Sequence, residues 1–357
     1  MEKINQEQKA EENSTQVQIA KVENNYGLTL EDVNKIVKDE VALVLKEQAL
    51  IANDKVRERL NDFSNVFIPK LVKANMLDCF SDPAVQMFFR NTEKTAICTD
   101  NINCYEILSE ILIHRVQKKE DYTAIAATNR AVEIADKISE DALLFLTVFL
   151  CVNNFYPNSG NIKVGFNVLD QLYGKIMKGK TLPFDRKIID NLEIVGAIKV
   201  ESLLSYKMFE EFFPIELEGY SCAGIEIHSE SYKRMKDILA SVELNVNTVC
   251  SESLIENHIR INVPKKERLK TMFTSTQQER VNNALEEIYK LYDNSNEKVE
   301  SAKKEFLNLL ENYPNIVKVK EWWNANIIDS GIKITPVGRV LAHVNAKNLD
   351  SNVPDLD

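Results

Sequence analysis

The sequence predicts a mainly α-helical protein with small β elements, an α+β chain with a helical N-terminal domain and a winged-helix-like C-terminal half. Two observations lead to this fold class. Apolar residues recur at spacings of three and four through most of residues 30–154, which is the helical period. Short β-type runs directly follow Gly196 and Gly331, where a glycine is able to end a helix or form a turn.

The N-terminal segment, residues 1–28, is expected to be a polar tail that carries one short strand. Gln16 to Val22 alternates polar and apolar residues with period two, which is a strand signal. A lone strand leaves its hydrogen-bonding edges open, so it has to pair with something. We interpret it as an oligomerisation arm, with the equal alternative that it clips onto its own domain.

The second segment, residues 29–155, is expected to be a helical domain. Thr29 is placed to cap a helix whose apolar residues are Val33, Ile36, Val37, Val41 and Val44. Ser81-Asp82-Pro83 predicts a helix start with proline in the first turn, and Ser139 is placed to cap the very apolar helix that follows. The turn-forming residues from Asn153 to Gly160 predict a domain boundary.

The C-terminal half is divided into a mixed, winged-helix-like domain over residues 156–264 and a helical pair with a terminal strand and helix over residues 265–357. A helix from Phe184 to Val195 is followed by a strand from Ala197 to Val200, and a second strand is expected from Val242 to Val249. Two polar helices are expected between Gln277 and Leu310. Near the end, Gly331 to Thr335 predicts a strand, with Thr335 capping a helix that begins at Pro336.

Composition excludes several classes of protein. The chain has 357 residues, of which 44% are hydrophobic and 27% charged, so it is neither disordered throughout nor collagen-like. The net charge of −10 argues against a protein built mainly to coat nucleic acid or an anionic membrane. The longest apolar run, Leu143 to Val152, is about half of the roughly 20 residues that a membrane span needs. We therefore expect no membrane partner.

The cysteines and the N-terminus indicate a cytoplasmic protein. The six cysteines are scattered, without a C-x-x-C pair, and are expected to be reduced thiols. Residues 1–15 are rich in Glu, Gln and Asn and resemble neither a secretory signal nor a transit peptide.

Few residues suggest catalysis. The ten glycines form no Walker A loop, no G-x-G-x-x-G turn and no G-x-S-x-G elbow. Glu110 and His114 lie four apart on one helical face with Cys98 and Cys104 before them, but a surface pair accounts for this spacing better than a metal site does. We expect no catalytic residues, no metal ligands and no cofactor. An enzyme assembled from dispersed residues, such as a hydrolase or nuclease, is the last alternative.

One basic cluster keeps nucleic acid as a second choice of partner. It lies after the turn at Pro264 and could contact phosphates beside a winged-helix-like unit. The alternative is an ordinary solvated loop in an acidic protein, because no aromatic residues are interleaved for base stacking. The cluster consists of Arg260, Lys265, Lys266, Arg268 and Lys270.

Several stretches together resemble a bacterial family of unknown function whose members carry LPO and Vpar locus tags. They are Gln18-Ile19, Asn25 to Leu28, Asp82-Pro83, Ile107 to Arg115, Asn129 to Ala135, Leu146 to Val152 and Ile334 to Asn345. The helical middle and the terminal strand and helix are also similar, more loosely, to bacterial abortive-infection proteins of the alpha type. The first resemblance implies no particular activity, and the second implies a role in anti-phage defence.

The leading hypothesis is a non-enzymatic cytoplasmic interaction or regulatory protein that forms a homo-oligomer or binds a protein partner. The alternative, from another class, is a nucleic-acid-binding regulator with winged-helix-like units. The two differ in what they require: an oligomerisation element near the N-terminus for the first, and an outward-facing basic cluster for the second.

Overall fold

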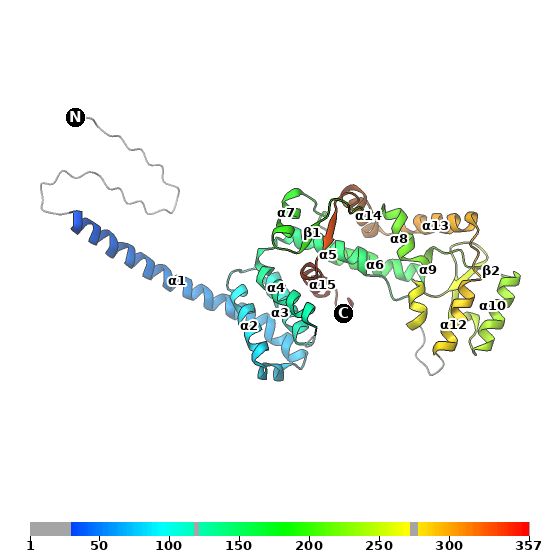
Figure 1. Cartoon of the computed structure of the whole chain (residues 1–357), viewed down its shortest axis with the longest axis horizontal. Helices are drawn as coiled ribbons and strands as arrows, with labels where there is room; N and C mark the ends of the chain where they lie inside the picture. Colours follow the sequence, from blue (N-terminus) through cyan, green and yellow to red (C-terminus); the bar gives the residue numbers. More distant parts are fainter. Residues whose placement is uncertain (1–29, 118–120, 272–277, 357) are drawn as a thin grey trace, which may run out of the picture. The chain divides into compact units, whose positions relative to one another are not determined.

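A computed structural model describes residues 30–117, 121–271 and 278–356, and Figure 1 shows its elements in sequence colours. The chain separates into two compact units, Met1–Glu58 and Arg59–Asp357, and the division lies inside the first helix. Each unit is described by itself below. The predicted strand from Gln16 to Val22 and the polar tail before it lie outside the described residues.

Helices make up most of the described chain, which confirms the predicted fold class. The helices are α1 (Leu30–Lys73), α2 (Pro83–Ala96), α3 (Ile102–Gln117), α4 (Tyr122–Ile134), α5 (Glu140–Asn154), α6 (Ile162–Met177), α7 (Arg186–Ile194), α8 (Phe209–Glu216), α9 (Glu218–Ser221), α10 (Glu230–Ser241), α11 (Val246–Val249), α12 (Gln278–Tyr289), α13 (Asn296–Leu310), α14 (Pro314–Asn326) and α15 (Pro336–Leu349), with 3₁₀ turns η1 (Leu77–Ser81), η2 (Ala135–Lys137) and η3 (Lys266–Thr271).

Local capping signals predicted several helix starts correctly. The Asp82 side chain accepts a hydrogen bond from the Ala84 N–H at the start of α2, where Pro83 is the first residue. Ser139 accepts one from the Ala142 N–H at the start of α5. Each cap satisfies a backbone N–H that has no partner within its own helix.

Two small antiparallel sheets account for the β structure of the described residues. In the first, β1 (Ile198–Val200) pairs with β5 (Ile332–Ile334), with Ile198 opposite Ile334. In the second, the strand order is β2-β4-β3. Its strands are β2 (Ile225–Glu226), β3 (Cys250–Glu252) and β4 (His258–Ile261). The winged-helix character of these units stays a prediction.

The strand predicted from Val242 to Val249 is wrong. This stretch holds a turn and the short helix α11, and β3 begins only at Cys250. The physical reason is local: the Asn245 side chain accepts a hydrogen bond from the Thr248 N–H and so starts a helical turn. The alternation of Val242, Leu244 and Val246 matches a strand pattern, but the Asn245 cap stabilises a helical backbone conformation instead.

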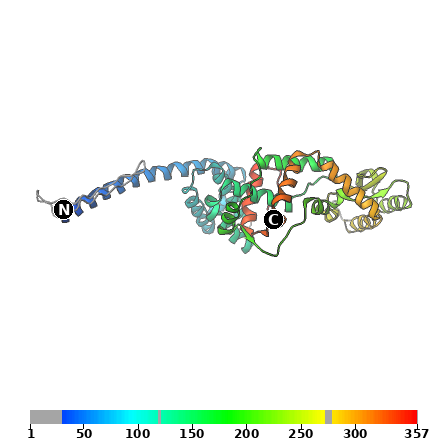
Figure 2. The same cartoon turned by 90° about the horizontal axis from the view of Figure 1, so that it is seen from above.

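The main core of the second unit is built around α5 and α15. α5 is buried on nearly all sides, as its uninterrupted apolar sequence requires. α15 packs against α3, α4 and α5 and lies beside them in both views (Figures 1 and 2). The last long helix of the chain therefore completes the core of the N-terminal helices. This core extends from Phe63 to Val353 and is continuous across the predicted boundary at residue 155.

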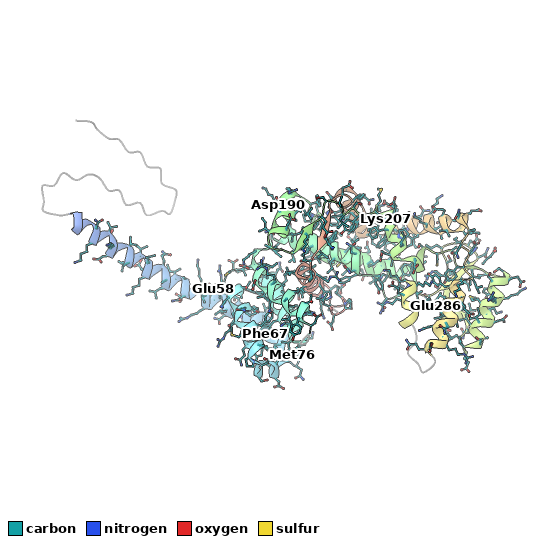
Figure 3. The ribbon with its side chains drawn as sticks, in the orientation of Figure 1. Glu58, Phe67, Met76, Asp190, Lys207 and Glu286 are labelled. Carbon is teal, nitrogen blue, oxygen red and sulfur yellow. The ribbon has the colours of Figure 1, made fainter. Side chains whose placement is uncertain are left out.

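Aromatic side chains fill two parts of this core. Phe67, labelled in Figure 3, lies within 5.4 Å of Phe89 and 5.6 Å of Phe63, measured between ring centroids. On α14, the Trp323 indole N–H donates to the carbonyl oxygen of Lys207, also labelled, at 3.0 Å. Trp323 is 1% exposed, and its one polar atom is satisfied, so it anchors the core as a buried tryptophan should.

A second, smaller apolar cluster lies in the same unit. It combines the β2-β4-β3 sheet with α10, η3 and α12, the helix that carries Glu286 in Figure 3. The two polar helices expected between Gln277 and Leu310 are present as α12 and α13. They belong to different clusters, because Leu285 of α12 packs in the second cluster and Phe306 of α13 in the first.

Thr335 joins β5 to α15 as the sequence predicted. Its hydroxyl accepts a hydrogen bond from the Gly338 N–H at 3.1 Å and donates to the carbonyl oxygen of Gly196 at 2.7 Å. One side chain thus caps α15 and holds the glycine turn that precedes β1.

We expect Thr335→Ala to lower the free energy of unfolding by about 1–2 kcal/mol, because both the cap and the bond to Gly196 are lost. Urea denaturation followed by circular dichroism measures the change. Thr335→Ser retains the hydroxyl and is expected to remain close to the wild type. Equal losses for both variants would show that the methyl group, rather than the hydroxyl, is what matters.

Candidate functional site

The basic cluster predicted after Pro264 does not form one surface, because Arg260 is buried. Arg260 lies on β4 and is 1% exposed, so it cannot contact a phosphate in solution. Lys266 and Arg268 lie in η3 and Lys265 directly precedes it; Lys266 is exposed, and the other two are half-buried. The side chain of Lys270 lies outside the described residues. The structure therefore separates Arg260 from the cations with which the sequence grouped it.

Arg260 is held by backbone carbonyl groups and by an aromatic ring. Its Nη2 donates to the carbonyl oxygen of Gly160 at 2.5 Å, and its Nη1 donates to those of Ile261 at 3.0 Å and Val263 at 3.3 Å. The guanidinium carbon lies 5.3 Å from the centroid of the Tyr220 ring. Burial lowers the pKa of Arg260 below its ordinary value, because the charged form loses its hydration. These contacts make Arg260 a structural residue.

The groups around Arg260 are neutral at physiological pH. Burial raises the pKa of the Cys222 thiol to about 11 and that of the Cys250 thiol to about 12, and the Arg260 charge only partly opposes this. Tyr292 is buried, and its hydroxyl accepts a hydrogen bond from the Ile261 N–H at 2.7 Å. A nucleophilic cysteine needs a thiolate, so neither thiol is prepared for catalysis.

The remaining described cations of the basic cluster are accompanied by carboxylates and aromatic rings. Lys265 forms an ion pair with Glu216 at 2.5 Å. Its ammonium and the guanidinium of Arg268 each lie 5.0 Å from the centroid of the Tyr156 ring. Lys266 is exposed over the Tyr289 ring at 5.3 Å, while its backbone N–H donates to Glu218. These neighbours reduce the positive potential that a phosphate backbone would meet.

Two adjoining cavities lie beside Arg268. One has a volume of about 580 Å³ and is lined by Tyr156, Leu169 and Leu172, and the other, of about 320 Å³, reaches Arg339 and His343. The last described residues form one wall. Their carboxylates are ion-paired, Asp350 with Lys175 and Asp355 with Lys347, and His343 Nε2 donates to the carbonyl oxygen of Pro354. An apolar floor with guanidinium groups at its rim suits a small anion that has an apolar body.

Glu110, paired with His114 in the sequence, takes another partner. Lys70 forms ion pairs with Glu106 at 2.5 Å and with Glu110 at 2.8 Å, while His114 is buried. Burial raises the pKa of the Cys104 thiol to about 12. Within residues 30–117, 121–271 and 278–356, no three His, Cys, Asp or Glu side chains form a group that could hold a metal ion.

The most unusual surface of the described chain lies on α1, before the division at Glu58. Large apolar side chains cluster there and are about half exposed or more. They are Val41 at 50%, Leu43 at 60%, Val44 at 47%, Leu45 at 64%, Leu50 at 60% and Ile51 at 51%. Figure 3 shows the side chains of this part of α1 as far as Glu58.

The sequence predicts a helix here but not the exposure of its apolar residues. A pattern that could have indicated this exposure is present, because residues 41–51 are apolar on several sides of the helix rather than on one face. A helix of that kind is normally enclosed. None of the helices in the described part of the chain combines the length and the apolar character that a membrane span requires.

We expect Arg260→Leu to lower the free energy of unfolding by about 2–4 kcal/mol, because three carbonyl oxygens lose a charged donor. The matched control is Lys266→Leu, which also replaces a cation by leucine but at an exposed position six residues away, with an expected effect within about 0.5 kcal/mol. Urea titration of both variants measures the difference. If the two losses were equal, Arg260 would not be the structural residue described above.

Comparisons with known proteins give one match. No curated protein and no solved structure matches this chain. A model of one protein family, whose description (":-like") names no activity, matches residues 27–357. That range includes both core clusters and all of α1. The chain therefore belongs to this family, the uncharacterised bacterial family that its sequence resembles.

Proposed function

We propose that this chain is a non-enzymatic interaction protein, and that α1 between Val37 and Ile51 is the surface with which it binds protein. The observation that carries the proposal is the exposure of six large apolar side chains within eleven residues. Scattered apolar residues are normal on a protein surface, whereas a concentration of them marks an interaction site.

The energetics of a single helix support this function. Fully burying one Val, Leu or Ile side chain stabilises a protein by about 1.5–3 kcal/mol. None of the described side chains from Asn34 to Glu58 is buried, so this part of α1 gains little of that stabilisation by itself. Isolated helices are marginal in water, and packing of an apolar face normally stabilises them. A protein partner that covers residues 41–51 would supply this packing.

A cytoplasmic, regulatory role fits a protein that acts by binding rather than by chemistry. The role in anti-phage defence rests on the looser resemblance alone and stays a prediction. Infection of bacteria that carry the wild-type gene or a variant with glutamine at the six exposed positions tests it, with plaque numbers as the measurement.

A photo-reactive amino acid at position 45, in place of Leu45, is expected to give covalent adducts with protein inside the cell, because that side chain lies against the partner. Mass spectrometry of the adduct identifies the partner. The matched control has the same amino acid at Lys46, the adjacent exposed position on the polar side of the helix, where we expect few adducts.

The outcomes decide whether this part of α1 is a protein-binding surface. Adducts with any defined protein at position 45, including another copy of this chain, support the proposed function. Adducts at neither position, or equal adducts at both, contradict it.

The nucleic-acid alternative has less support in the geometry. Arg260 is unavailable, and Glu216 and Glu218 lie against the cations that remain. We expect no shift of DNA or RNA by the wild-type protein at low salt. A salt-sensitive shift that disappears when Lys265, Lys266, Arg268 and Lys270 are changed to Glu would overturn this expectation.

A further inference from the structure

The two cavities beside Arg268 are continuous in their lining. Phe155, Tyr156, Arg268 and Pro354 line both of them, so the cavities meet at these residues. Their volumes, about 580 Å³ and about 320 Å³, each lie in the range of small-molecule sites, which is about 300–1,000 Å³. Every lining residue belongs to the second unit. The two cavities can therefore be treated as two compartments of one site.

The larger compartment is mainly apolar. Its lining includes Val168, Leu169 and Leu172 of α6, and its charged lining residues are Arg268 and Asp350. Leu169 and Leu172 are buried, whereas Val168 is 46% exposed. An apolar lining of this kind gains free energy when it covers the apolar part of a ligand.

The smaller compartment contains two guanidinium groups. Arg268 lines it from η3 and Arg339 from α15, together with the buried His343. The Arg268 guanidinium lies against the Tyr156 ring, which orients it without cancelling its charge. Arg339 is exposed and takes part in none of the ion pairs between described residues.

The carboxylates at the site are neutralised by lysines. Asp350 forms an ion pair with Lys175 at 2.9 Å, and Asp355 forms one with Lys347. Each of these pairs is neutral as a whole, so the charge of Arg339 makes this part of an acidic protein locally positive. A guanidinium holds a carboxylate or a phosphate with two parallel hydrogen bonds, and this geometry favours an anionic ligand over a neutral one.

We propose that the two cavities form one binding site for a small organic anion, in which a carboxylate or phosphate head is joined to an apolar body. The head contacts Arg339 and Arg268 in the smaller compartment. The body lies in the larger compartment against Val168, Leu169 and Leu172. This inference goes beyond the proposed function, because the site lies within the second unit and does not involve the apolar surface of α1.

The first experiment is calorimetric titration of the full-length chain with four probes: octanoate, octyl phosphate, octanol and acetate. At least one of the two amphipathic anions is expected to bind saturably at a single site per chain, with a Kd of about 1 mM or below. Octanol lacks the charged head and acetate lacks the apolar body. Each is therefore expected to bind at least about tenfold more weakly.

Arg339→Gln tests the contact with the head group. It is expected to weaken binding of the anion by about tenfold or more, because a charge-assisted hydrogen bond is lost, and to leave octanol binding unchanged. The matched control is Arg186→Gln, the same substitution at an exposed arginine at the start of α7 that lines neither cavity. We expect the control to bind the anion as the wild type does.

Val168→Gln tests the contact with the apolar body. It is expected to weaken binding of the anion by about fivefold or more, because a polar amide replaces an apolar contact. Val164→Gln is the matched control, since Val164 lies one turn earlier on α6, is 50% exposed and is not among the lining residues. Both positions are exposed and glutamine is a good helix former, so both variants are expected to fold.

Three results would overturn the proposal: no saturable binding of octanoate or octyl phosphate up to about 10 mM, octanol bound as tightly as the anions, or equal effects within either pair of variants. Binding of only one of the two anions supports the proposal and identifies the head group as a carboxylate or a phosphate. The photo-adduct experiment at position 45 concerns α1 alone, so its result is independent of these titrations.

Discussion

The buried guanidinium of Arg260 is the constraint on which the arrangement of the second unit depends. It reaches from β4 to the carbonyl oxygen of Gly160 and so connects the small sheet with the loop between α5 and α6. The backbones of Gly160 and Asn262 approach each other so closely that a Cβ on Gly160 would lie 1.9 Å from the Asn262 carbonyl oxygen. Only glycine permits this contact. The loop, the sheet and η3, which follows β4, are therefore placed together.

This constraint also changes the meaning of the basic residues. An arginine that satisfies three carbonyl groups stabilises the fold and adds no positive charge to the surface. Lys265 is ion-paired with Glu216 in the same region. With a net charge of −10 over the whole chain, these pairings leave little positive potential at this surface for a phosphate backbone.

Large apolar residues are mostly buried in the second unit and exposed on α1 before Glu58, and this contrast supports the proposed function. In the second unit, α15 returns to cover α3, α4 and α5 and completes their core. On α1 before Glu58, residues such as Leu45 and Leu50 are 64% and 60% exposed. Apolar surface that one chain leaves exposed is a source of free energy for association.

The sequence by itself determined the features that depend on neighbours along the chain. Helix starts at Pro83, Ser139 and Thr335 were predictable because a cap is a hydrogen bond between residues two or three apart. The tertiary structure decided what depends on distant residues: the burial of Arg260 under the Gly160 loop and the exposure of α1 before Glu58. Charge and hydrophobicity are properties of a residue, but whether either meets solvent depends on which segments pack over it, and no local pattern records that.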